Sequence, residues 1–136
     1  MTIVDTSVWI DYLEGREHWT VDRLVELIED RETLAFSDLI LLEIIQGIRE
    51  EKDRELIERK FDPLVCFEVK RSTIRLAAGI HQGMHRKGIQ IRSIIDCLIS
   101  ALSIETGAKI LHKDRDFEFI ASQYPVITHT QGSANK

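Results

Sequence analysis

Short apolar, β-branched runs alternate with longer stretches of helical periodicity along this chain of 136 residues. Candidate strands lie at residues 2–4, 33–36, 64–69, 109–111 and 126–128. Strands separated by helices need crossover connections, so the alternation predicts an α/β fold with a mainly parallel sheet of about four to five strands and helices on both faces. Ligands of such open sheets bind outside the carboxyl ends of the strands. The pattern therefore predicts a fold class and the sheet edge where a site should lie.

Helical patterns fill the segments between these runs. The expected helices cover residues 7–13, 20–30, 39–47, 50–60, 72–87, 93–106 and 117–123. Ser37 or Asp38 would cap the third of these helices, and Gly47 would help to end it. The fourth is densely charged, so we expect it to be solvated, whereas the strand at 64–69 should be buried. We expect one domain over residues 1–130, followed by a polar tail over residues 131–136.

Composition restricts the cellular setting. With 43% hydrophobic residues the chain can bury a core. The sequence lacks a signal peptide and any run near the ~18 apolar residues that span a bilayer, so we expect a soluble, cytoplasmic protein with no membrane contact. Cys66 and Cys97 lie in apolar runs and are expected to be buried, reduced thiols. A net charge of −5 argues against indiscriminate binding of nucleic acid but permits local positive charge.

Four carboxylates stand beside apolar runs or inside apolar helices. They are Asp5, Glu43, Asp96 and Asp114. Asp5 and Asp114 directly follow candidate strands, which places them at the functional edge of the predicted sheet. Carboxylates that converge repel one another unless a hard divalent cation neutralises them. The set therefore indicates metal-assisted phosphate chemistry.

Most of these acids also have an ordinary structural explanation. Asp5 could be a helix N-cap. Asp96 lies three residues after Ser93, which resembles a capping box. Asp114 could cap a helix whose first turn holds Asp116, where the helix dipole favours an acid. Such explanations account for the acids one at a time, but not for their joint placement in one small α/β fold.

Glu43 is the acid that capping explains least. On a helical wheel it points the same way as Leu39 and Ile40, inside a run where nearly every neighbour is apolar. An ionised carboxylate buried among apolar side chains is costly without a partner. We therefore expect a cation or an arginine beside Glu43.

Two further groups of residues have open interpretations. The segment "HRKGIQIR" gathers positive charge at His85, Arg86, Lys87 and Arg92. This charge either belongs to a solvated loop or binds RNA beside the acids. Large apolar side chains gather near the N-terminus at Trp9, Ile10, Leu13 and Trp19. They form either part of the core or a surface for a partner or a second copy of the chain.

Four motifs occur in order along the chain. They are "IVDTSVWIDYL" at residues 3–13, "LLEIIQG" at 41–47, "IIDCLISAL" at 94–102 and "HKDRDFEFIA" at 112–121. On these motifs nearly the whole chain resembles the PIN-domain ribonucleases and, among them, the VapC toxins of type II toxin–antitoxin modules. One mild departure is Ser100, which stands where alanine is common. The resemblance assigns no role to Lys113.

The resemblance implies a PIN-like fold and a metal-dependent endoribonuclease that inhibits translation and growth. Its acidic residues match Asp5, Glu43, Asp96 and Asp114, with Asp116 as an additional acid and Ser7 as a hydroxyl near the metal. The implied cofactor is Mg²⁺, or Mn²⁺, and the implied products carry a 5′-phosphate and a 3′-hydroxyl. The implied partners are an RNA substrate, a VapB-like antitoxin and a second copy of the chain in a homodimer.

Within this scheme we predict two groups of metal ligands. Asp5, Glu43 and Asp96 are assigned to a first ion. Asp114 and Asp116 are candidates for a second ion or for orienting water. Possible RNA contacts are Arg86, Lys87 and Arg92.

Three other classes of protein are alternatives to this ribonuclease interpretation. A phospho-receiver domain needs adjacent acids after its first strand, and a phosphatase of the haloacid-dehalogenase type needs Asp-x-Asp there. Residues 5–7 are Asp-Thr-Ser, which disfavours both. A non-catalytic PIN-like scaffold that binds RNA or protein is the remaining alternative. It has no reason to keep a self-repelling set of acids.

Overall fold

A computed structural model describes residues 1–132. Its sheet is entirely parallel and has four strands in the order β3-β2-β1-β4. The strands are β1 (Thr2–Val4), β2 (Leu34–Phe36), β3 (Val65–Cys66) and β4 (Lys109–Leu111). At the centre of the sheet, Ile3 of β1 pairs with Ala35 of β2 on one side and with Ile110 of β4 on the other. The predicted α/β class and parallel sheet are confirmed.

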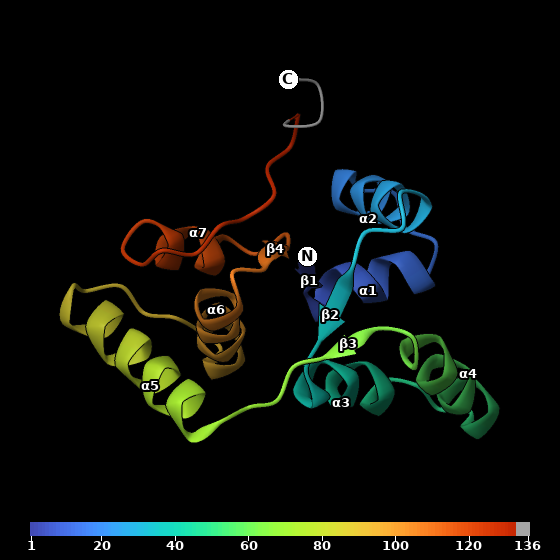
Figure 1. The fold of residues 1–136 in the computed structure, drawn as a ribbon, viewed down its shortest axis with the longest axis horizontal. Coiled ribbons are helices and arrows are strands. Elements are labelled where there is room, and N and C mark those ends of the chain that lie inside the picture. The colour runs from blue at the N-terminus through green and yellow to red at the C-terminus, as the bar shows by residue number, and fades with distance from the viewer. Residues whose placement is uncertain (133–136) are drawn as a thin grey trace.

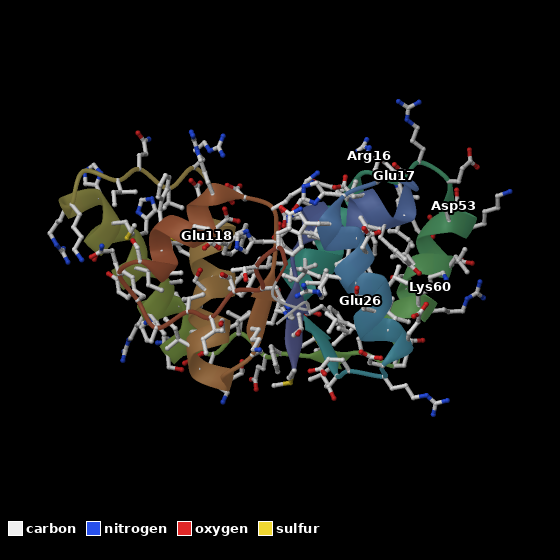
Figure 2. The ribbon with its side chains drawn as sticks, turned by 90° about the horizontal axis from the view of Figure 1, so that it is seen from above. Arg16, Glu17, Glu26, Asp53, Lys60 and Glu118 are labelled. Carbon is white, nitrogen blue, oxygen red and sulfur yellow. The ribbon has the colours of Figure 1, made fainter. Side chains whose placement is uncertain are left out.

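Helices cover the sheet on both sides. They are α1 (Thr6–Leu13), α2 (Trp19–Glu29), α3 (Asp38–Gln46), α4 (Glu51–Phe61), α5 (Arg71–Arg86), α6 (Ile94–Thr106) and α7 (Arg115–Ala121). Figure 1 shows α1 to α4 on one side of the strands and α5 to α7 on the other. The view from above in Figure 2 gives the same division. Within residues 1–132, no helix is long and apolar enough to cross a membrane.

The core is built from the strands and from the inner faces of the helices. Ile3, Ile110 and Ile99 are fully buried, and α6 is buried along most of its length. Removing this apolar surface from water supplies the main driving force for folding, at about 25 cal/mol for each Å² buried. Because α6 runs through the core, the acid in its first turn has a fixed position relative to the sheet.

Helix α4 was expected to be solvated, and one side of it is not. Its residues Ile57 and Phe61 are only 6% and 3% exposed. The Phe61 ring lies with its centroid 4.9 Å from the ring centroids of both Trp9 and Phe36. This aromatic cluster attaches α4 to the core, while the many charged residues cover its outer faces. The prediction underestimated the burial of α4, because two large side chains are enough to anchor its three turns to the core.

The segment 64–69 was expected to be a buried strand, and this was wrong. Only Val65 and Cys66 form a strand, and both are exposed, because β3 is the edge strand and pairs with β2 alone. Cys66 is therefore an exposed thiol, whereas Cys97 is buried as predicted. The last expected strand, at 126–128, is reduced to a single bridge between Thr128 and Ile110. Residues 133–136 of the predicted polar tail lie outside the described residues.

The packing of α5 against Tyr124, which follows α7, gives a test of the fold. Gly79 and Gly83 both lie inside α5, but a Cβ at Gly79 would meet open space, whereas one at Gly83 would overlap the Tyr124 hydroxyl. We expect Gly79→Ala to raise the free energy of unfolding by about 0.5–1 kcal/mol, because alanine loses less backbone entropy in a helix. Gly83→Ala should lower it by about 1–3 kcal/mol through overpacking.

Chemical denaturation of both variants measures these changes. In a Tyr124→Phe background the overlapping oxygen is gone and the ring carbon lies 3.4 Å from the added Cβ, an ordinary contact. Gly83→Ala should then lose most of its penalty. Equal effects of the two glycine substitutions would contradict this arrangement of α5.

Candidate metal centre

Asp5 leaves the carboxyl end of β1 and caps α1. Its side chain accepts a hydrogen bond of 2.6 Å from the Ser7 hydroxyl and a longer one of 3.4 Å from the Ser7 backbone N–H. Asp5 is only 8% exposed. Burial raises the pKa of this carboxyl, and the hydrogen bonds from Ser7 oppose that rise. The capping role and a place at the predicted edge of the sheet are therefore both present.

Asp96, Asp114 and Asp116 form the tightest group of acids. Each offers a carboxylate oxygen, and the three oxygens lie within 4.8 Å of one another. Asp96 lies in the first turn of α6, and Asp114 caps α7 by accepting a 2.9 Å hydrogen bond from the Asp116 backbone N–H. Asp116 is 2% exposed. This cluster of carboxylates could bind a divalent metal ion.

The cluster holds a different combination of acids from the first set predicted. Asp114 and Asp116 share this group with Asp96, whereas Asp5 and Glu43 are not members of it, although Asp5 is the acid that acts most strongly on the pKa of Asp96. Glu43 was expected to be buried, and it is only partly so. Its carboxylate accepts a 2.9 Å hydrogen bond from the Thr6 hydroxyl. A polar partner from α1 therefore lies where we expected a cation or an arginine.

The pKa of Asp96 responds to the charge of the whole group of acids. Burial and repulsion by the surrounding carboxylates raise its pKa to about 8. The acids responsible, in decreasing order of effect, are Asp5, Asp114, Asp116 and Glu43. All the acids that the sequence singled out therefore converge on one place.

Arg92 supplies positive charge to this cluster. Its backbone N–H donates a 3.1 Å hydrogen bond to Asp116, and its guanidinium lies 3.4 Å from Asp114 and 3.6 Å from Asp116. The side chain is 67% exposed, so these contacts are weak and the guanidinium is free to turn outwards. Of the predicted charge run, Arg92 thus joins the acids. Arg86 and Lys87 lie at the end of α5, where Lys87 donates to Gln123.

His112 was missed by the sequence reasoning. Its ring is 5% exposed and accepts a 3.1 Å hydrogen bond at Nδ1 from the Asp114 backbone N–H. Because Nδ1 accepts, the proton resides on Nε2, which donates to the Glu118 carboxylate at 2.7 Å. The ring also packs on Phe117. His112 thereby fixes the turn that presents Asp114, and its position directly after β4 was the available signal.

Lys113 also acquires a place. Its ammonium group pairs with Asp11, a residue of α1 that is 2% exposed and that accepts a further 3.2 Å hydrogen bond from Arg16. The hydrogen bond from Lys113 is the main reason that the pKa of Asp11 is lowered. Arg16 also pairs with Glu14, so the two cations and two carboxylates of this network balance in charge, and Lys113 presents its ammonium group at the rim of the site.

An open hollow of about 390 Å³ connects these parts. Its lining consists of Asp5, Ser7, Arg92, Lys113, Asp114 and Arg115. Acids form the floor and three cations stand on the rim. Such a site suits a ligand that is both metal-binding and anionic, as a phosphate diester is.

The raised pKa of Asp96 predicts how stability depends on pH in metal-free protein. In the folded state the Asp96 carboxyl keeps its proton up to about pH 8, whereas an aspartate in the unfolded chain releases it near the ordinary pKa of 3.8. Protonated Asp96 therefore makes its full contribution to stability below pH 3.8, and this contribution is lost as the pH rises towards 8. Asp96→Asn cannot ionise, so it should become progressively more stable than wild type between pH 5 and pH 9, by an amount on the order of several kcal/mol.

Thermal unfolding in EDTA across this pH range measures the difference. Asp62→Asn is the control, because Asp62 is exposed and ends α4, away from the acids. If the unfolding temperatures of wild type and Asp96→Asn change with pH in parallel, the pKa of Asp96 is not raised in the folded state.

Comparison with known proteins places the chain in a family. The model of the PIN domain matches residues 2–122. Two relatives, VapC ribonuclease Mb1587 of Mycobacterium bovis and Ribonuclease VapC11 of Mycobacterium tuberculosis, are each 35% identical to this chain over 136 residues. The matched residues cover 98% of this chain and 98% of each relative. Ribonuclease VapC19 of Mycobacterium tuberculosis is 31% identical over 114 residues, or 82% of this chain and 86% of the relative.

Solved structures support the same fold. VapBC2 from Rickettsia felis, bound to a DNA fragment from its promoter, superposes with a TM-score of 0.74 at 15% identity, covering 94% of this chain and 96% of the other. FitAcB from Neisseria gonorrhoeae gives a TM-score of 0.70 at 16% identity, with 96% and 97% covered. The predicted PIN-like fold is therefore confirmed, and the chain belongs to the PIN-domain family, within which its relatives are the VapC proteins.

Proposed function

We propose that this chain is an endoribonuclease that uses a divalent cation, Mg²⁺ or Mn²⁺, to hydrolyse RNA. The observation that carries the proposal is the convergence of Asp96, Asp114 and Asp116, together with a hollow that Asp114 shares with Arg92, Lys113 and Arg115. The activity in the names of the VapC relatives is consistent with it. No side-chain nucleophile is needed for such chemistry.

The donor set fits a hard cation. Carboxylate oxygens are the ligands that Mg²⁺ and Mn²⁺ prefer, and a cation would offset the repulsion that raises the pKa of Asp96 to about 8. We assign Asp96, Asp114 and Asp116 as the nearest candidate ligands. Asp5 and Glu43 complete the acidic wall, and Ser7 and Thr6 hold their carboxylates in place.

When bound, the cation would lower the pKa of a coordinated water and stabilise the charge on the phosphate. The protein's own contribution is to position the diester. Lys113, Arg92 and Arg115 can bind its oxygens, and Asp11 restrains Lys113 so that less side-chain entropy is lost on binding. Arg92 must release Asp114 and Asp116 to do so, which its exposure allows.

The proposal predicts loss of cleavage when a carboxylate is neutralised. Asp96→Asn and Asp116→Asn should each reduce cleavage of total RNA by a factor on the order of a hundred or more, because charge stabilisation worth several kcal/mol is removed. Antitoxin-free protein is incubated with RNA in Mg²⁺, in Mn²⁺ and in EDTA, with Asp62→Asn as the matched control. Cleavage in EDTA, or a fully active Asp96→Asn protein, would overturn the mechanism. Binding of RNA without cleavage by wild type would favour a non-catalytic scaffold.

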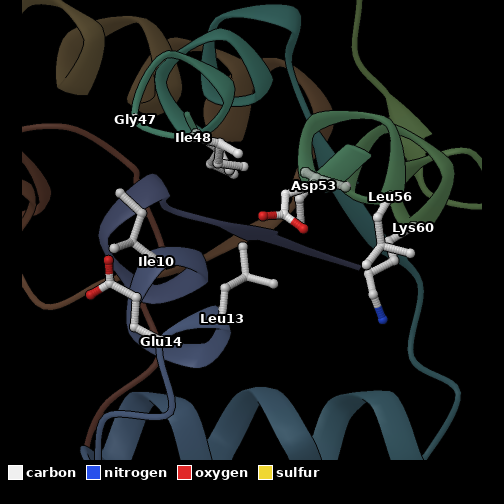
Figure 3. Close-up of a pocket in the computed structure, with 10 residues that line it drawn as sticks. Ile10, Leu13, Glu14, Gly47, Ile48, Asp53, Leu56 and Lys60 are labelled. Atoms are coloured by element: carbon white, nitrogen blue, oxygen red, sulfur yellow. The ribbon is translucent and has the colours of Figure 1, made fainter. Parts of the chain in front are cut away.

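We further propose that the protein is the toxin of a type II toxin–antitoxin pair and is restrained by a VapB-like antitoxin. A groove of about 350 Å³ between α1, the end of α3 and α4 is the docking site we assign (Figure 3). Its apolar lining comprises Ile10, Leu13, Ile44, Ile48, Leu56 and Ile57, with Glu14, Asp53 and Lys60 among the charged residues. An apolar floor with a charged border fits an amphipathic helix.

The groove also resolves the open interpretation of the N-terminal apolar residues. Trp9 belongs to the core at 6% exposure, whereas Leu13 is 37% exposed and faces the groove together with Ile10. These four residues therefore do not form one surface, since Trp19 lines a different hollow.

A charged residue in the groove should prevent docking. Leu56→Glu, which replaces a side chain that is 45% exposed, should reduce the affinity for the cognate antitoxin by at least tenfold, because a carboxylate would be desolvated in the interface. Ile74→Glu on α5 is the control, since Ile74 is somewhat more exposed, at 55%, and does not line the groove. Both purified variants are checked for native circular dichroism, and binding is measured by calorimetry. Equal binding by the two variants would exclude this groove.

A further inference from the structure

A second hollow adjoins the one above the acids. It has a volume of about 360 Å³ and shares Lys113, Asp114 and Arg115 with the first. Its other walls come from the start of α2, with His18 and Trp19, from Glu118 of α7, and from the segment that follows Thr128. The volume falls in the range of roughly 300–1,000 Å³ typical of small-molecule sites. A ligand that spans both hollows must pass over Lys113.

The aromatic wall of this second hollow is held in place. His18 caps α2, because its Nδ1 accepts a 3.2 Å hydrogen bond from the Thr20 backbone N–H. The Trp19 ring lies next to it, with 6.1 Å between the ring centroids and 33° between the planes. The guanidinium carbon of Arg23 lies 5.9 Å from the centre of the Trp19 ring. Trp19 is partly buried against the core, so the indole is oriented before any ligand arrives.

The charge of the hollow suits a nucleotide. Lys113 and Arg115 stand where the two hollows meet, and the Lys113 side chain is 35% exposed although Asp11 anchors its ammonium group. An ammonium group has three donors, so it retains the capacity to bind a phosphate oxygen. These two cations offset Asp114 and Glu118, which also line the hollow, so its lining carries no excess of negative charge although the chain as a whole has a net charge of −5.

We propose that the second hollow binds the nucleotide next to the scissile phosphate, with its base against Trp19 and His18 and the linking phosphate on Lys113. Proteins that recognise single-stranded RNA stack unpaired bases on aromatic side chains and follow the backbone with cations. The hollow holds both elements, and Asp114 of the acidic group lines it as well. This inference rests on the proposed ribonuclease activity and adds a base-binding subsite to it.

Trp19 could instead serve only to pack α2 and to hold Arg23. A purely structural role would make Trp19→Ala less stable and less active on every substrate alike. A subsite would make the loss depend on whether the substrate carries a base at one position. The test must therefore vary the protein and the RNA together.

The substrate is a short RNA oligonucleotide with one cleavage site, compared with a series in which one nucleotide at a time lacks its base. On intact RNA we expect Trp19→Ala to lower kcat/KM by roughly 5- to 150-fold, the range observed for the loss of one base–aromatic stack. Trp19→Phe should retain most of the activity. Removal of the base at the position beside the cut should cost wild type a similar factor and cost Trp19→Ala almost nothing more. Phe119→Ala, which removes an aromatic ring that is 40% exposed on α7 and lines neither hollow, is the control.

The outcomes separate the two proposals. If wild type and Phe119→Ala cleave RNA but the effects of Trp19→Ala and of base removal multiply independently at every position, the subsite is excluded and the ribonuclease stands. An unchanged kcat/KM for Trp19→Ala also excludes the subsite. If wild type cleaves no RNA in Mg²⁺ or Mn²⁺, the ribonuclease proposal fails and the subsite fails with it.

Discussion

The structure depends on holding several like charges together at one edge of a small parallel sheet. Parallel pairing of β1 with β4 brings the residues after these strands to the same edge, so Asp5 and Asp114 must approach each other. Helix α6 then adds Asp96 from its buried first turn. In metal-free protein this proximity is unfavourable, and burial together with repulsion by the neighbouring acids raises the pKa of Asp96 to about 8. The rest of the fold supplies enough apolar burial to tolerate that strain.

Three of the acids, Asp5, Glu43 and Asp116, are each held by a partner that leaves part of the carboxylate available. Ser7 holds Asp5, Thr6 holds Glu43, and the backbone of Arg92 holds Asp116. His112 restrains the backbone of Asp114 and not its carboxylate. Neutral hydroxyls, backbone amides and an imidazole orient these groups without cancelling their charge. The one cation that touches the cluster, among residues 1–132, is the exposed guanidinium of Arg92, so the negative potential is preserved.

Local sequence pattern predicted the parts of the fold that depend on local sequence. The strands at Thr2–Val4 and Lys109–Leu111 were predicted to the residue, because a short β-branched run between polar signals leaves little choice. The exposure of Cys66 was not predictable in this way, since only the order of strands makes β3 an edge. The acids were predictable by type and position. Their grouping around Asp96 was not predictable, because it depends on contacts between distant segments. The pair formed by Lys113 and Asp11 likewise joins segments about a hundred residues apart. The role of His112 depends on the geometry of a turn that no sequence pattern encodes.

Helix α1 explains how one short element can serve three functions. Its N-cap is an acid of the candidate metal centre, and Asp11 in its second half anchors Lys113 at the rim of that candidate site. Ile10 and Leu13, three residues apart and so on one face, line the groove assigned to the antitoxin. A partner docked in that groove therefore lies against the same eight-residue helix that fixes Asp5 and, through Asp11, Lys113. No proline or glycine interrupts α1, so nothing in its sequence favours a kink, and we expect a displacement at the groove to reach Asp5 and Asp11 through the helix as a rigid body.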